Sequence, residues 1–123
     1  MEEIKKLKEF REKMNKIIIK KGTINTKRFF NLDENVYKDG NLTRKTKELL
    51  GLVASVVLRC DDCIKYHLIQ LMKLETKYEE FFEVFDVALI VGGSITIPHI
   101  RRAVEILEEF KGKEELVDEK KRI

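Results

Sequence analysis

Two cysteines and a histidine lie within eight residues of one another and form the stretch best suited to chemistry. They are Cys60, Cys63 and His67. At about 100° per residue, a helix would bring these three side chains back to within roughly 60° of one direction, so they would share a face. A thiol pair on a first helical turn can close a disulfide, and the amide donors there stabilise a thiolate. The spacing therefore predicts a redox-active pair with a base one turn further along.

Glu48 is the fourth candidate, and it can reach this face only through a helical hairpin. It lies 11 residues before Arg59, and His67 lies 8 residues after it. If the chain reverses around Arg59, the axial offset between Glu48 and His67 is about 5 Å at 1.5 Å per residue. A carboxylate that orients an imidazole serving a cysteine completes the set of nucleophile, base and orienting group used in covalent catalysis. We therefore expect Cys60, Cys63, His67 and Glu48 to form one catalytic site.

The residues between and beside the cysteines are charged. Asp61 and Asp62 place two negative charges between the thiols, and a nearby negative charge opposes thiolate formation. Arg59 and Lys65 offset these charges only in part. The local charge is therefore expected to disfavour the thiolate.

Helices are expected to position these residues, because apolar residues recur at threes and fours and proline occurs once. The first helix should end at Gly22 through a left-handed cap. Thr43 is expected to cap the helix that carries Glu48, and the wide apolar surface of that helix predicts the most buried element. Asp61 or Asp62 is expected to cap the helix that carries the cysteine pair.

Two more helices are expected after the cysteine motif. Thr76 and Glu79 form a capping-box pattern for a helix that ends at Gly92-Gly93. Pro98 suits the first turn of a final helix.

The length of 123 residues fits one hydrophobic core, so we expect a single domain over residues 1–123. This domain would begin with an N-terminal helix over residues 1–22. Residues 23–42 carry aromatic side chains and can include a short helix before the turn at Asp39-Gly40. Residues 112–123 form a charged tail that we expect to be loosely held.

The composition argues against several classes of partner. The 25 basic and 22 acidic residues give a net charge of +3 and are interleaved, which is not typical of a nucleic-acid-binding stripe. No stretch approaches the roughly 20 apolar residues of a membrane span, and the first residues lack the apolar region of a signal peptide. Two cysteines are too few for the disulfide framework of a small secreted domain. We therefore expect a soluble, cytoplasmic protein that binds neither nucleic acid nor membrane.

The four candidate residues are separated along the chain by eleven, two and three residues. This spacing resembles the signature of the alkylhydroperoxidase-D-like (AhpD-like) group within the carboxymuconolactone decarboxylase family. The flanking stretches are similar too: Asp39-Gly40-Asn41-Leu42-Thr43, Lys45-Thr46-Lys47-Glu48-Leu49-Leu50, and Glu79-Glu80 before a helix ending at Gly92-Gly93. The resemblance is strongest over residues 36–110 and fits a single-repeat member.

The resemblance implies a compact all-α AhpD-like fold of about five to seven helices, with the Cys-x-x-Cys pair at a helix N-terminus. It also implies an antioxidant enzyme, an oxidoreductase of the peroxidase type that forms trimers or hexamers. By carry-over, Cys63 attacks the peroxide and becomes a sulfenic acid, and Cys60 supplies a proton and then forms the disulfide. Glu48 and His67 would relay protons. The substrate would be a hydroperoxide or a disulfide, a thiol protein or small dithiol would act as reductant, and no cofactor or metal is expected.

Other interpretations of the same residues stay open. The cysteines can be small apolar packing residues on an amphipathic helix. With His67 they supply three of the four ligands of a zinc site, which Glu48, water or another subunit would complete. Haem attachment is disfavoured because Ile64, and not a histidine, follows Cys63. Taken alone, His67 is typical of a core histidine and Glu48 of a surface charge.

His99 is expected on the surface without a catalytic role, and Tyr66 can border the thiols. A decarboxylase or related lyase acting on a small carboxylated lactone would need a base but no sulfur chemistry. A non-enzymatic oligomeric binding module would show no redox-linked change. In each case a homo-oligomer is expected, because the apolar surface exceeds what one protomer of this length can cover.

Overall fold

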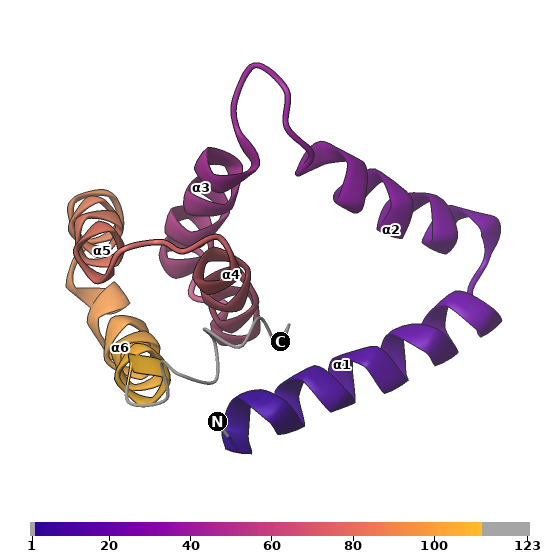
Figure 1. Cartoon of the computed structure of the whole chain (residues 1–123), viewed down its shortest axis with the longest axis horizontal. Coiled ribbons are helices and arrows are strands. Elements are labelled where there is room, and N and C mark those ends of the chain that lie inside the picture. The colour runs from indigo at the N-terminus through magenta and orange to yellow at the C-terminus, as the bar shows by residue number, and fades with distance from the viewer. Residues whose placement is uncertain (1, 112–123) are drawn as a thin grey trace. The chain divides into compact units, whose positions relative to one another are not determined.

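The computed structural model describes residues 2–111, and within this range every regular element is a helix (Figure 1). The elements are α1 (Glu2–Lys21), α2 (Ile24–Val36), α3 (Arg44–Val57), α4 (Asp61–Lys73), α5 (Tyr78–Gly92), the 3₁₀-helix η1 (Ser94–Thr96) and α6 (Ile97–Lys111). This confirms the all-α prediction and the expected helix count. The predicted loose tail, residues 112–123, lies outside the described residues.

The helices fall into two compact units. The first contains α1 and α2, and the second runs from residue 45 and contains α3 to α6. All four candidate site residues belong to the second unit. The single domain over residues 1–123 stays a prediction, and each unit is described by itself.

In the first unit, Gly22 separates α1 from α2, but not in the way expected. Gly93 is the one glycine with a positive φ among residues 2–111, so the left-handed cap predicted at Gly22 is wrong. The Gly22 amide donates to the Ile18 carbonyl oxygen at 2.7 Å. A Cβ atom at Gly22 would lie 2.6 Å from that oxygen and 2.9 Å from the Cβ atom of Thr26. Glycine is required here by close approach of neighbouring atoms and not by backbone conformation.

The segment after Gly22 forms a longer helix than the sequence suggested. The Thr23 hydroxyl accepts a hydrogen bond from the Thr26 amide, and α2 then continues for 13 residues. Phe29 and Leu32 on this helix are exposed. The apolar residues of α2 therefore do not form the buried stripe by which an amphipathic helix is predicted from its sequence. At the end of the unit, the Asp39 carboxylate accepts from the Arg44 amide at 2.6 Å. The helix that follows begins directly after Thr43, as predicted.

The second unit buries a compact apolar core. α4 packs beside α6, and α5 packs against both η1 and α6. The core side chains are Leu52 and Val56 of α3, Ile64, Leu68, Ile69, Leu71 and Met72 of α4, Phe81, Phe85 and Ala88 of α5, and Ala103, Ile106, Leu107 and Phe110 of α6. α3 was expected to be the most buried helix, but α4 buries every residue from His67 to Met72. The helix that carries the cysteines is therefore the central element of this unit.

Three residues with positive φ mark helix ends in this unit. Arg59 has φ 61°, Glu75 has φ 58° and Gly93 has φ 81°. The first reverses the chain between α3 and α4, as expected from the hairpin argument. The second lies between α4 and α5, and the third ends α5 at the predicted Gly92-Gly93 pair.

The capping box at the start of α5 lies one residue later than predicted. α5 begins at Tyr78, and the Glu80 carboxylate accepts from the Lys77 amide at 2.8 Å. The Lys45 ammonium of α3 also donates to Glu80, at 2.9 and 3.0 Å. These bonds, from Lys45 first and from the Lys77 backbone second, lower the pKa of Glu80. The ion pair to α3 thus explains why Glu80, and not Glu79, takes the capping role.

Polar contacts also fix α6 in this unit. Pro98 lies in its first turn, as expected. The Tyr78 hydroxyl of α5 donates to the Glu108 carboxylate of α6, and this bond, ahead of burial, raises the pKa of Tyr78 to about 12. None of the helices formed by residues 2–111 has the length and apolar character needed to cross a membrane.

Candidate functional site

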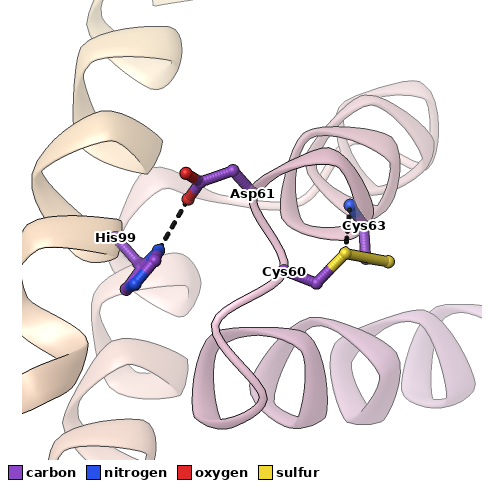
Figure 2. Close-up of a disulfide and its surroundings, with 4 residues drawn as sticks. All are labelled: Cys60, Asp61, Cys63 and His99. Carbon is purple, nitrogen blue, oxygen red and sulfur yellow. Dashed lines mark hydrogen bonds and ion pairs between the residues drawn. A yellow bond between two sulfur atoms is a disulfide. The ribbon is translucent and has the colours of Figure 1, made fainter.

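The cysteine pair forms a disulfide at the start of α4 (Figure 2). The Cα atoms of Cys60 and Cys63 are 5.3 Å apart, a separation that suits a disulfide. Cys60 has an extended backbone, and its sulfur accepts from the Cys63 amide at 3.3 Å, so Cys60 is the N-cap of α4. The predicted caps, Asp61 and Asp62, are instead the first two helical residues.

The position of the disulfide gives it access to both solvent and helix amides. Cys63 is exposed, while Cys60 is half-buried. The first turn of a helix presents amide donors that lack carbonyl partners and carries partial positive charge. A thiolate formed at either sulfur would be stabilised there. This location therefore favours thiol chemistry.

One turn along α4, His67 is held by Glu48 of α3. The Nδ1 atom of His67 lies 2.8 Å from the Oε1 atom of Glu48. Glu48 is 1% exposed and His67 8%, so water hardly competes for this contact. Where the Glu48 carboxylate accepts this bond, Nδ1 carries the hydrogen, and in the neutral ring Nε2 is then the nitrogen with the lone pair. The pair can thus present Nε2 as a proton acceptor.

The four predicted site residues therefore form two bonded pairs, Cys60–Cys63 and Glu48–His67. Helix α4 carries one member of each pair. Cys63 and His67 are four residues apart on α4 and so lie one turn apart. The hairpin at Arg59 brings Glu48 back to His67, as the helix arithmetic predicted. Tyr66 packs edge-on against the His67 ring, with ring centroids 5.5 Å apart. Its predicted position beside the thiols stays a prediction.

A second polar cluster was not foreseen. The Asp61 carboxylate contacts two residues of α6, His99 at 2.8 Å and Arg102 at 3.0 Å. The His99 side chain is only 17% exposed, so the expectation of a plain surface residue is wrong. His99 and Arg102 are three residues apart and share a helix face. That spacing was the only signal in the sequence, and nothing in it pointed to Asp61.

The environment of Asp61 acts on its pKa in two opposing ways. Burial is the largest influence and raises the pKa, but the hydrogen bonds from His99 and Arg102, with their charges, outweigh it and lower the pKa. The carboxylate is therefore ionised and paired at neutral pH.

The residues available to a metal do not form a ligand set within the described part of the chain. Among residues 2–111, no three or more His, Cys, Asp or Glu side chains are grouped in a way that could hold a metal ion. The two sulfurs that the zinc interpretation requires as ligands are bonded to each other.

Comparison with known sequences identifies the family. The sequence model of the carboxymuconolactone decarboxylase family matches residues 25–108. The chain belongs to this family. The AhpD-like resemblance is confirmed, because the AhpD-like group is part of the carboxymuconolactone decarboxylase family.

Related family members include solved structures. A carboxymuconolactone decarboxylase family protein from Thermotoga maritima, for which a role in the antioxidative response has been suggested, is 57% identical. The alignment covers 89% of this chain and 93% of that one, with a TM-score of 0.85. A family protein from Legionella pneumophila is 28% identical over 89% of this chain and 98% of its own, with a TM-score of 0.80. "Uncharacterized protein 4 in cox locus" of Paracoccus denitrificans is 27% identical over 68% of this chain and 76% of its own length.

Proposed function

We propose that this family member is a thiol-dependent oxidoreductase of the alkylhydroperoxidase type. It would reduce hydroperoxides or disulfides through a Cys60/Cys63 dithiol–disulfide cycle. One observation carries the proposal: an accessible disulfide caps α4 one turn before a histidine that a buried carboxylate orients. The suggested antioxidative role of the Thermotoga maritima relative supports the same assignment.

The first step is attack of sulfur on the peroxide. His67 takes the proton of Cys63, and the thiolate attacks the terminal oxygen of the hydroperoxide. The O–O bond breaks, Cys63 becomes a sulfenic acid, and the alkoxide leaves with the proton of Cys60 as an alcohol. Sulfur loses the two electrons that the peroxide gains. Glu48 stabilises the protonated His67 while this occurs.

The second step closes the disulfide. The Cys60 thiolate attacks the sulfenic sulfur of Cys63, and the S–O bond breaks. The departing hydroxide takes the proton held by His67 and leaves as water, which restores the neutral imidazole. The sum is two thiols and one hydroperoxide giving one disulfide, one alcohol and one water. The 5.3 Å separation of the Cα atoms supports rapid closure, because the resolving thiol needs no large movement.

A separate dithiol then restores the enzyme. Its thiolate attacks a sulfur of the Cys60–Cys63 bond, forms a mixed disulfide, and leaves as its own disulfide when its second thiol attacks. The exposure of Cys63 suits this exchange, since the attacking sulfur must approach along the disulfide axis. Both a thiol protein and a small dithiol fit this requirement.

The proposal is tested by following hydroperoxide consumption in the presence of a small dithiol. Wild type should turn over repeatedly, and Cys63→Ser should be inactive because it lacks the attacking sulfur. Cys60→Ser is the matched control: it keeps Cys63 and should accumulate a sulfenic acid that a dimedone-type reagent traps. Equal rates for wild type and Cys63→Ser would reject the proposal. Turnover of a carboxylated lactone by a variant lacking both cysteines would favour a lyase instead.

We also propose that the protein acts in the cytoplasm as a homo-oligomer, a trimer or hexamer. Large apolar side chains are exposed on several helices, including Phe29 and Leu32 of α2 and Phe82 and Ile90 of α5. Contact with further copies would remove this surface from water. Light scattering at micromolar concentration should give the mass of an assembly, and the mass of a single chain would contradict this.

A further inference from the structure

One of the two carboxylates between the cysteines is held by another helix. Asp61 follows Cys60 directly and is the first residue of α4. Its Oδ1 atom lies 2.8 Å from Nδ1 of His99, and its Oδ2 atom lies 3.0 Å from Nε of Arg102. Figure 2 shows the Asp61 side chain directed toward His99 and away from the sulfurs. Both carboxylate oxygens are thus engaged by α6.

The hydrogen positions follow from what each group can donate. The ionised Asp61 carboxylate only accepts, so His99 must carry its hydrogen on Nδ1 to bond to it. Arg102 Nη2 lies 3.2 Å from the same nitrogen, but it cannot donate to a nitrogen that already holds a hydrogen. The useful bond from Arg102 is therefore the one from Nε to Oδ2. Arg102 adds a permanent positive charge to this bond.

This pairing bears directly on the thiols. A bare carboxylate beside a cysteine raises the energy of the thiolate, and a guanidinium bound to that carboxylate cancels most of its field. Asp62, the second acidic residue between the cysteines, is exposed, and water screens its charge. Arg59 and Lys65 flank the motif and add positive charge. Neutralising the Asp61 charge would therefore make a thiolate at the neighbouring cysteines less costly.

We propose that His99 and Arg102 are positioning residues of the redox site, which hold the Asp61 carboxylate on α6 and so reduce the electrostatic cost of a thiolate at Cys63. The inference rests on the proposed function, since it concerns how the Cys60/Cys63 couple is tuned. His99 and Arg102 make no described contact with the sulfurs and lie outside the Cys-x-x-Cys motif. They would act on the redox site only through Asp61. The lowered pKa of Asp61 is consistent with this inference, because the hydrogen bonds that favour the ionised carboxylate also neutralise its charge.

The competing explanation is that the cluster merely joins α4 to α6. A structural tie would affect unfolding but not the thiol equilibrium. The two explanations are distinguished by the pKa of the Cys63 thiol in the reduced protein. This pKa is measured from the ultraviolet absorbance of the thiolate as a function of pH, in the Cys60→Ser background. The second readout is the equilibrium of the intact pair with glutathione. Two glutathione thiols reduce the Cys60–Cys63 disulfide and are themselves oxidised to glutathione disulfide.

The main variant is Arg102→Gln, whose side chain is half-exposed and so tolerates substitution. Arg101→Gln is the matched control, because it removes the same charge from an exposed neighbour on α6. His99→Gln is a second variant that removes the other partner of Asp61. Asp61→Asn, alone and combined with Arg102→Gln, completes a double-mutant cycle.

Arg102→Gln should raise the thiol pKa by about half a unit and shift the glutathione equilibrium toward the protein disulfide. His99→Gln should act in the same direction, and Arg101→Gln should do neither. In the Asp61→Asn background, Arg102→Gln should have little further effect, because the charge it neutralised is gone. An unchanged thiol pKa in Arg102→Gln, or an equal shift with and without Asp61, would overturn the inference. Both readouts are equilibrium properties of the thiols and do not require peroxide turnover. If wild type failed to turn over peroxide, the proposed function would be rejected, but the effect of Arg102→Gln on the thiols would still be measurable.

Discussion

Two histidine–carboxylate pairs involve residues within or one turn after the cysteine motif, and their environments differ far more than their geometry. Glu48–His67 and Asp61–His99 each join Nδ1 to a carboxylate oxygen at 2.8 Å. The side chains of the first pair are 1% and 10% exposed, and those of the second are 35% and 17% exposed. The two pairs therefore have the same hydrogen-bond distance and differ in burial, which is the basis for proposing a proton relay at Glu48–His67 and a charge-neutralising contact at Asp61–His99.

The difference in burial has a physical consequence for each pair. Water cannot replace a lost partner in the buried pair, so Glu48 and His67 depend on each other. Asp61 has a second partner in Arg102 and is partly reached by water. Loss of one contact at Asp61 should therefore cost less stability than loss of the contact at Glu48.

The largest expected effect is a loss of activity when the buried pair is disrupted. His67→Gln should lower kcat/KM for an alkyl hydroperoxide about 100-fold, because it removes the proposed base for Cys63. His99→Gln is the matched control and should lower it less than about tenfold, since it acts only through the Asp61 charge. Similar losses in the two variants would show that the pairs do not have different roles.

The next effect is on stability and sharpens the same contrast. Glu48→Ala should lower the free energy of unfolding by about 3 kcal/mol, because it leaves a buried imidazole without its partner. Asp61→Ala should cost about 1 kcal/mol or less, as expected for a partly exposed ion pair. Urea titrations of both variants and wild type give the comparison. Equal costs would mean that burial is not the deciding variable.

The sequence was sufficient to predict the relative positions of the candidate residues wherever one helix or one hairpin connects them. Cys63 and His67 are four residues apart, so helix geometry alone predicts their common side. Glu48 needed only the reversal at Arg59, which occurs. The helix class and most helix ends followed from apolar spacing and from Gly93 and Pro98.

Long-range partners could not be predicted in the same way. His99 and Arg102 are 38 and 41 residues from Asp61, and their contact depends on how α6 packs beside α4. The cap of α4 was missed because the Cys60 sulfur replaces the oxygen that usually fills this role. The capping box of α5 was misplaced because the Lys45 ion pair favours Glu80. In each case a tertiary contact or an unusual atom overrode the local pattern.

The smallest effect concerns acid and follows from the lowered pKa of Asp61. A carboxyl group whose pKa is lower in the folded state stabilises the protein fully above its ordinary value of 3.8, and this contribution is lost as pH falls through the folded-state value. Asp61→Asn should therefore be less stable than wild type at neutral pH, and the difference should shrink below about pH 4. Unfolding curves at both pH values check this. A difference that is constant or grows in acid would contradict the sign.

If Cys60 and Cys63 work as one redox couple, a hydroperoxide should oxidise both thiols together, and counting free thiols checks this. Protein reduced in advance and freed of reductant is mixed with one equivalent of an alkyl hydroperoxide, and free thiols are then titrated. The account predicts that both thiols disappear together, that one alcohol forms per chain, and that Cys63→Ser keeps its remaining thiol. Survival of both thiols in wild type while the hydroperoxide stays intact would contradict it.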